Sequence, residues 1–280
     1  MKRMHRIFIL VAGLAVVTAA RADGHGPAYA LATPTLAQGQ WSSDTAMMDM
    51  SSDMGSAVSY REMAGYGITQ DLTASFAFPV AQGAEPASGM RATQEMMGGD
   101  KDLQGSLLWR FQREASGIGE RSESSVLFSA WDSRDATVDG LQAGQGMAVS
   151  AVTGHASRTT YWWFGAGVQH YLPDAGARLG DLYYVSAVWG WRPEYFRRDA
   201  PGSDWRLFVE ALGESAQRDR LGGMPLAGTG GNKLLLGPSL LGLYGAWGVE
   251  VGALFPVAQD HEPGQPRERY RAKAVFTYWF

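Results

Sequence analysis

Methionine is concentrated in two short stretches of this chain, and its thioether sulfur can bind metal ions. The first is the run MMDMSSDM, and the second lies in a later polar stretch beside Glu95. Thioethers are soft ligands that favour monovalent copper or silver over hard cations. Methionine also fills irregular apolar gaps, so a soft-metal site and simple packing both remain open. The candidate ligands, which we expect on neighbouring external loops, are Met47, Met48, Met50, Met54, Met90, Met96 and Met97.

Charged side chains recur at alternate positions of several segments, as they do where a strand lines a polar channel. They would either set the selectivity of a solute route or form an internal ladder of ion pairs that blocks it. A barrel of about twelve strands is intermediate in width, so both alternatives remain open. The candidate lumen residues are Asp102, Arg110, Arg206, Glu210, Glu214, Arg269, Arg271 and Lys273.

Catalytic chemistry finds little support in the sequence. His155 and Ser157 are neighbours in GHASR, but no orienting carboxylate or oxyanion donor accompanies them. The glycine-rich GTGGNK at 228–233 lacks the ending of a phosphate-binding loop. We therefore predict that the protein is not an enzyme and carries no cofactor beyond a possible copper or silver ligand. A lipid-modifying enzyme ranks third among the functions considered.

Segments of alternating apolar and polar residues, separated by polar turns, follow one another along the chain. Because successive side chains of a strand point to opposite faces, this period of two predicts strands. The even number of segments favours an all-β fold, a transmembrane antiparallel up-and-down barrel of about 12 strands. The expected strands are 40–48, 56–67, 72–80, 102–112, 123–131, 147–153, 159–171, 181–191, 205–217, 233–243, 248–258 and 269–280.

The predicted turns alternate between tight and long, as in outer-membrane barrels with short periplasmic turns and long external loops. Long external loops are expected at 81–101, 132–146 and 218–232. The same five-residue sequence, FPVAQ, ends two of the predicted strands that run toward the external loops. Proline cannot donate to a ladder, so Pro79 and Pro256 are expected where pairing stops.

The last strand, RYRAKAVFTYWF, has one apolar face and one largely charged face. Tyr270, Phe276 and Phe280 share the first face, and Arg271 and Lys273 share the second. A barrel in a membrane turns the apolar face outward and places aromatic residues at the interface. We therefore expect residues 40–280 to form the barrel and the strand 269–280 to close it. The outer face of the barrel is expected to contact outer-membrane lipid.

The amino terminus has the features of a secretory signal. A basic stretch precedes a short apolar run and small residues, which predicts a signal peptide at 1–22. The whole chain has 24 lysines and arginines, and removing the four in the signal peptide leaves 20 against 28 acidic residues. The resulting formal charge of −8 argues against nucleic acid as a partner. The segment 23–39 is expected to be either a disordered periplasmic lead-in or a small plug. The chain contains no cysteine.

The stretches YGITQDLTASFAFPV (66–80), ALATPTLAQGQW (30–41) and DWRLFVEALGE (204–214), with the terminal Phe280, resemble a known family. The family comprises small outer-membrane barrels grouped with the meta-pathway phenol-degradation, transporter-like proteins. Within it, the chain resembles an uncharacterised branch that is associated with metal resistance. The resemblance implies passage of small molecules and recognition of the terminal aromatic by barrel-assembly machinery. We predict an outer-membrane protein of a Gram-negative bacterium that passes small solutes or metal ions. The alternative is a non-conducting surface barrel that binds soft metal.

Overall fold

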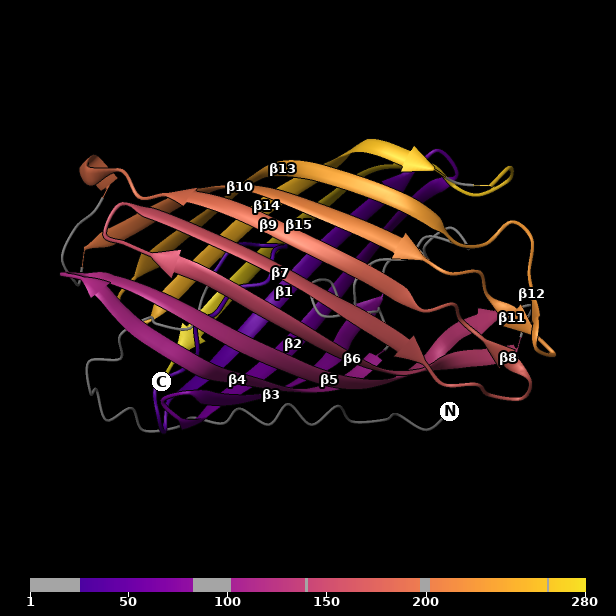
Figure 1. The fold of residues 1–280 in the computed structure, drawn as a ribbon, viewed down its shortest axis with the longest axis horizontal. Coiled ribbons are helices and arrows are strands. Elements are labelled where there is room, and N and C mark those ends of the chain that lie inside the picture. Colours follow the sequence, from indigo (N-terminus) through magenta and orange to yellow (C-terminus); the bar gives the residue numbers. More distant parts are fainter. Residues whose placement is uncertain (1–25, 83–101, 139–140, 197–201, 261) are drawn as a thin grey trace, which may run out of the picture.

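Twelve long strands form one closed antiparallel barrel in the computed structural model, which describes residues 26–82, 102–138, 141–196, 202–260 and 262–280 (Figure 1). Each of the twelve predicted segments matches one of these strands, so the predicted fold class is confirmed. The strands are β1 (Trp41–Ser52), β2 (Gly55–Thr69), β3 (Leu72–Gln82), β4 (Asp102–Gly117), β5 (Glu120–Val138), β6 (Leu141–Ala156), β7 (Thr160–Tyr171), β9 (Leu182–Trp191), β10 (Ser203–Ala216), β13 (Gly231–Tyr244), β14 (Trp247–Asp260) and β15 (Glu268–Trp279).

The alternation in the sequence separates an outer and an inner face on each long strand. In β9, buried and exposed residues alternate along the whole strand, with Tyr184 inside and Trp189 outside. In β4, Trp109 and Phe111 are exposed whereas Arg110 is buried. The outer surface of the barrel is thus largely apolar, and the inner surface carries most of the charged side chains.

The barrel closes between its first and last strands. The amide of Trp41 donates to the carbonyl of Phe280 at 2.9 Å, and β1 and β15 pair from there to Ser52 and Glu268. We call the end that carries Trp41 and Phe280 the terminal rim and the opposite end the distal rim. The connections at the terminal rim are short, except for residues 192–202.

Local irregularities correct two of the expectations in part. The predicted loop 132–146 is wrong in part, because β5 and β6 continue as a paired hairpin to Val138 and Leu141. The expectation for the two FPVAQ prolines holds on one side of each strand. The β3–β4 ladder ends at Ala77, before Pro79, and the β14–β15 ladder ends at Leu254, before Pro256. On the other side, pairing with β2 and with β13 continues through a register shift at each proline, where a bulge accommodates the missing donor.

Short elements lie outside the barrel wall. At the distal rim, β8 (Ala177–Arg178), β11 (Arg220–Leu221) and β12 (Met224–Pro225) form a small sheet. The connection between β9 and β10 holds one turn of 3-10 helix, η1 (Glu194–Phe196). No helix in the described part of the chain is long and apolar enough to cross a membrane.

Candidate functional site: the occupied lumen

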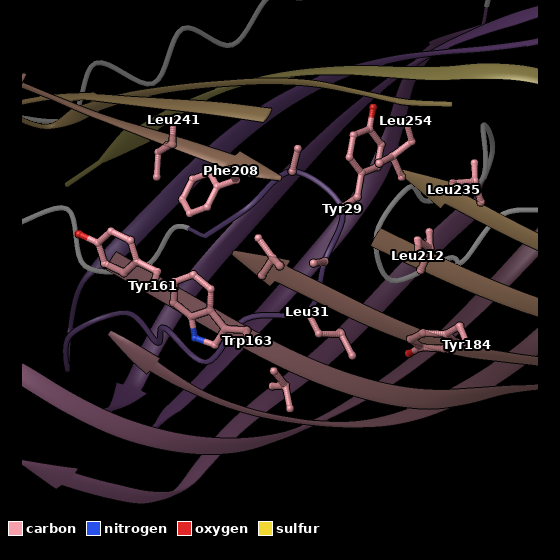
Figure 2. Packing of buried hydrophobic residues seen from close by; sticks show 14 of the residues in the cluster. Tyr29, Leu31, Tyr161, Trp163, Tyr184, Phe208, Leu212, Leu235, Leu241 and Leu254 are labelled. Atoms are coloured by element: carbon pink, nitrogen blue, oxygen red, sulfur yellow. The ribbon is translucent and has the colours of Figure 1, made fainter. Parts of the chain in front are cut away.

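Residues 26–40 are called here the N-terminal segment, and residues 26–36 of it lie inside the barrel, whereas residues 37–39 are exposed. Pro27 to Leu31 are all buried, and Tyr29 packs in the same apolar cluster as side chains of β7, β10 and β14 (Figure 2). Prolines and alanines give the segment no period of two that would add it to the sheet. Its backbone polar groups are satisfied by side chains of the wall instead, as buried polar groups require.

Glu210, on β10, is the main acceptor for this segment. Its Oε1 accepts the amide of Ala28 at 2.8 Å, and its Oε2 accepts the amides of Tyr29 at 2.7 Å and Ala30 at 2.6 Å. The hydroxyl of Ser239 donates to the same carboxylate. Only 1% of Glu210 is exposed, and no lysine or arginine among the described residues forms an ion pair with it. Four neutral donors therefore solvate a buried carboxylate.

Tyr29 and Ala28 also bind the opposite wall. The phenol hydroxyl of Tyr29 lies 3.0 Å from the carbonyl oxygens of Gly252 and of Arg271, to either of which it can donate. The ammonium group of Lys273 donates to the carbonyl of Ala28 at 2.7 Å. The segment is thus held across the lumen between β10 on one side and β14 and β15 on the other.

The rest of the segment runs toward the terminal rim through polar contacts. Thr33 donates to Glu123 at 2.9 Å and accepts the indole N–H of Trp163 at 2.9 Å. Thr35 donates to the carbonyl of Gln70, and the amide of Leu36 donates to the Thr73 hydroxyl, both at 2.9 Å. These partners come from different parts of the wall, so the segment is bound along its length.

A charged network lines the distal half of the lumen. The guanidinium of Arg271 is fully buried and forms bonds to Glu214, at 2.8 and 2.5 Å, and to Glu268. Lys233 binds the same Glu268 at 2.8 Å, and Lys273 lies 3.8 Å from Glu250. The two carboxylates that bind Arg271 neutralise it from both sides, so these buried charges are paired.

A second network lies nearer the terminal rim. Arg110 bridges Asp71 at 2.8 Å and Glu123 at 3.0 Å, and Arg121 also reaches Glu123, at 3.1 Å. On another part of the wall, Asp204 binds Arg192 and Arg206, and the guanidinium of Arg206 lies 5.3 Å from the centre of the Tyr161 ring.

Six of the eight predicted lumen residues lie on the inner face: Arg110, Arg206, Glu210, Glu214, Arg271 and Lys273. The prediction is wrong for Arg269, because the register of β15 shifts between Tyr270 and Glu268, which buries Glu268 and exposes Arg269. Asp102 begins β4, but its side chain lies outside the described residues. A role of these residues in selectivity stays a prediction.

Sequence reasoning missed several residues that contact the segment or its supporting charges. Glu123 and Glu250 occupy inward positions of predicted strands, so the period of two could have identified them. Glu268 could not have been found this way, because a bulge reverses the parity at that point. Nothing in the sequence indicates that Trp163 donates to the N-terminal segment or that Ser239 donates to Glu210.

Apolar side chains fill much of the remaining lumen. The rings of Tyr161 and Trp163 stack at 5.7 Å with an interplanar angle of 9°, and Phe208 lies within 6.4 Å of both. Leu212 and Leu254 are at most 1% exposed (Figure 2). A water-filled porin has a polar interior. This lumen is packed like a core around the N-terminal segment.

The methionines do not form the expected loop. Met47, Met48 and Met50 belong to β1, and only Met54 lies in the turn that follows it. Met47 is exposed on the outer face and Met48 is buried on the inner face, so these two sulfurs point apart. Met90, Met96 and Met97 lie outside the described residues. The described part of the chain holds no cluster of histidine and carboxylate ligands for a metal, and soft-metal binding stays a prediction.

The two residues weighed for catalysis have other partners. The Ser157 hydroxyl bonds to the backbone and side chain of Thr160 in the turn before β7. His155 Nδ1 lies 3.3 Å from the hydroxyl of Ser122. Each side chain is thus engaged locally, and no hydrogen bond joins them among the described contacts.

A cavity of about 40 Å³ at the distal rim is lined in part by Glu214, Lys233 and Gln265. That volume has room for a few water molecules at most. Asp181, at the same rim, accepts from Arg178 at 2.5 Å. Burial acts to raise the pKa of Asp181, but the Arg178 bond and charge, with His170, outweigh it and hold that pKa below its usual value.

Comparison with solved structures places this architecture among known folds. The chain superposes on an outer-membrane channel from Pseudomonas putida F1 with a TM-score of 0.62 and 11% identity, over 88% of this chain and 97% of the other. The fold is that of an outer-membrane β-barrel. The NanC porin matches with a TM-score of 0.52 and 9% identity, over 84% of this chain and 98% of the porin. No protein-family profile and no curated protein matches the sequence, so the resemblance to phenol-degradation barrels stays a prediction.

Proposed function

We propose that this protein is an outer-membrane channel for small solutes whose lumen is occupied by its own N-terminal segment in the resting state. Solute passage then requires residues 26–36 to leave the lumen while the barrel stays intact. The observation that carries the proposal is that the segment crosses the lumen bound by wall side chains, with Glu210 accepting three of its backbone amides.

The way the segment is attached supports its release. The twelve-strand ladder closes through Trp41 and Phe280, so withdrawing residues 26–36 breaks no strand pairing. The segment costs conformational entropy to order, and its release recovers that entropy. Solutes that replace its contacts then shift the balance toward the open lumen.

The outer face supports an outer-membrane location. At the terminal rim, Trp41 packs on Tyr66 with ring centres 4.6 Å apart, and Trp247 packs on Tyr278 at 4.2 Å. Aromatic girdles of this kind flank the apolar band of outer-membrane barrels. The apolar outer residues of β4, β9 and β14 would face the hydrocarbon.

A removable tether between the segment and the wall tests the proposal. A Cβ atom built on Gly252 lies 2.9 Å from the Cβ of Ala28. This is shorter than the roughly 3.5–4.5 Å found in disulfides, so the segment must move slightly away from β14 for the bond to form. The chain has no cysteine, so the variant Ala28→Cys, Gly252→Cys forms no other intramolecular disulfide. Its conductance is measured in a planar bilayer, first oxidised and then after a reductant is added.

We expect the oxidised double variant to stay closed and the reduced one to open, because only the reduced segment can leave the lumen. The single variant Gly252→Cys is the control for the added side chain and for the reductant. A variant lacking residues 26–36 should conduct continuously. If that deletion variant shows the heat-modifiable mobility of a folded barrel but passes no ions, the proposal is wrong.

A further inference from the structure

We propose that the Glu210 carboxylate and the cavity filled by Tyr29 form a binding site for an aryl-ethyl ammonium ion, a primary ammonium joined by two carbons to an aromatic ring. Such a ligand competes with residues 28–30 for the same contacts. The inference rests on the proposed function, since the site opens only when the N-terminal segment leaves it.

The first step concerns the donors around Glu210. Three of its four donors are amides of the segment, at 2.6 to 2.8 Å, and the fourth is the Ser239 hydroxyl. Departure of the segment leaves the Ser239 hydroxyl as the one remaining donor of these four, and water or a ligand must replace the other three. A ligand that brings N–H donors and a positive charge is the best replacement, because hydrogen bonds to and from charged groups are stronger than those between neutral groups.

The second step concerns the charges near Glu210. Lys273 donates to the Ala28 carbonyl at 2.7 Å and lies 3.8 Å from Glu250. Glu210 itself forms no ion pair with a described lysine or arginine, so its negative charge attracts a cation and repels an anion once the segment has left.

The third step concerns shape. Tyr29 itself spans the site, since its amide lies 2.7 Å from Glu210 and its hydroxyl lies 3.0 Å from the Gly252 carbonyl. Its ring belongs to the apolar cluster that contains Phe208, Leu212 and Leu254 (Figure 2). A hydrated inorganic cation would leave this apolar surface unfilled. An amine with the skeleton of a tyrosine side chain matches all three features at once: a nitrogen donor, an aromatic ring and a terminal hydroxyl.

Tyramine is the probe, because its ammonium, ring and phenol correspond to the amide, ring and phenol of Tyr29. The reporter is Ala30→Cys in the full chain, since Ala30 is buried and the chain has no other thiol. The rate of labelling by a water-soluble maleimide then measures how often the segment leaves. Tyrosol, in which a neutral hydroxyl replaces the ammonium, is the matched control ligand, and sodium chloride controls for cation charge alone.

We expect tyramine to raise the labelling rate roughly fivefold or more, the lower end of usual coupling between two sites, and tyrosol and sodium to leave it unchanged. Glu210→Gln in the same background should abolish the tyramine response, and Glu210→Asp should weaken it. Glu62→Gln, on β2, where the carboxylate accepts from the exposed Thr45, should keep it. Folding of every variant is checked by heat-modifiable mobility.

An equal effect of tyrosol or sodium, or a tyramine response that survives Glu210→Gln, would overturn the inference. The absence of any tyramine response in the folded reporter would do the same. These outcomes differ from a failure of the proposed function, which is decided by whether the chain without residues 26–36 conducts. A conducting deletion variant together with a tyramine-insensitive reporter would remove only the assignment of the ligand.

Discussion

Two arginines of β15, two positions apart, have opposite environments. Arg271 is fully buried between Glu214 and Glu268, whereas Arg269 is exposed beyond the register shift. Replacing Arg271 by leucine removes the guanidinium that binds both buried carboxylates and leaves Lys233 as the cationic partner of Glu268 among the described residues, which should lower the free energy of unfolding by about 3–5 kcal/mol. Arg269→Leu is the matched control and should change it by about 0.5 kcal/mol or less. Urea unfolding from lipid vesicles measures both values. Equal losses would mean that the buried network does not contribute as described.

Among the elements, the N-terminal segment depends on close contact with β2. The amide of Gly39 donates to the carbonyl of Gly67 at 2.8 Å, and the amide of Gly67 donates to the carbonyl of Gln40 at 2.9 Å. A Cβ atom at Gly67 would lie 2.0 Å from the carbonyl oxygen of Ala37. Gly67→Ala should therefore displace the segment and increase the fraction of time that the channel is open in single-channel recordings. Gly105→Ala, where nothing lies within 4 Å of the new Cβ, is the control. The explanation fails if both variants open the channel equally.

At the scale of the whole molecule, the barrel is closed by the pairing of its first strand, β1, with its last strand, β15. Met47 of β1 lies directly opposite Ala274 of β15, and both are exposed on the outer face. Residues opposite each other in an antiparallel pair have Cβ atoms about 4.5–5.5 Å apart. The variant Met47→Cys, Ala274→Cys should therefore form a disulfide on mild oxidation, seen as a reductant-sensitive shift in gel mobility of the unfolded chain. Met47→Cys with Tyr270→Cys, offset by about 13 Å along the strand, should not. Efficient cross-linking of the offset pair would contradict the closing register.

The sequence by itself determined the strands, their number and, where one face is clearly apolar, the side that faces inward. It left the orientation of β7 and β9 undecided, because both faces of these strands carry aromatic residues. These features are local, because alternation between neighbours such as Trp109 and Arg110 specifies the two faces of a strand whatever its partners. The tertiary structure alone decided that Glu268 replaces Arg269 in the lumen, since a bulge reverses the parity that sequence reasoning relies on. It also decided that residues 26–36 fill the barrel. Their proline and alanine residues have no period, and their partners, such as Glu210 and Gly252, are far away in sequence. Only closure of the barrel brings these wall residues together around a segment that itself forms no strand.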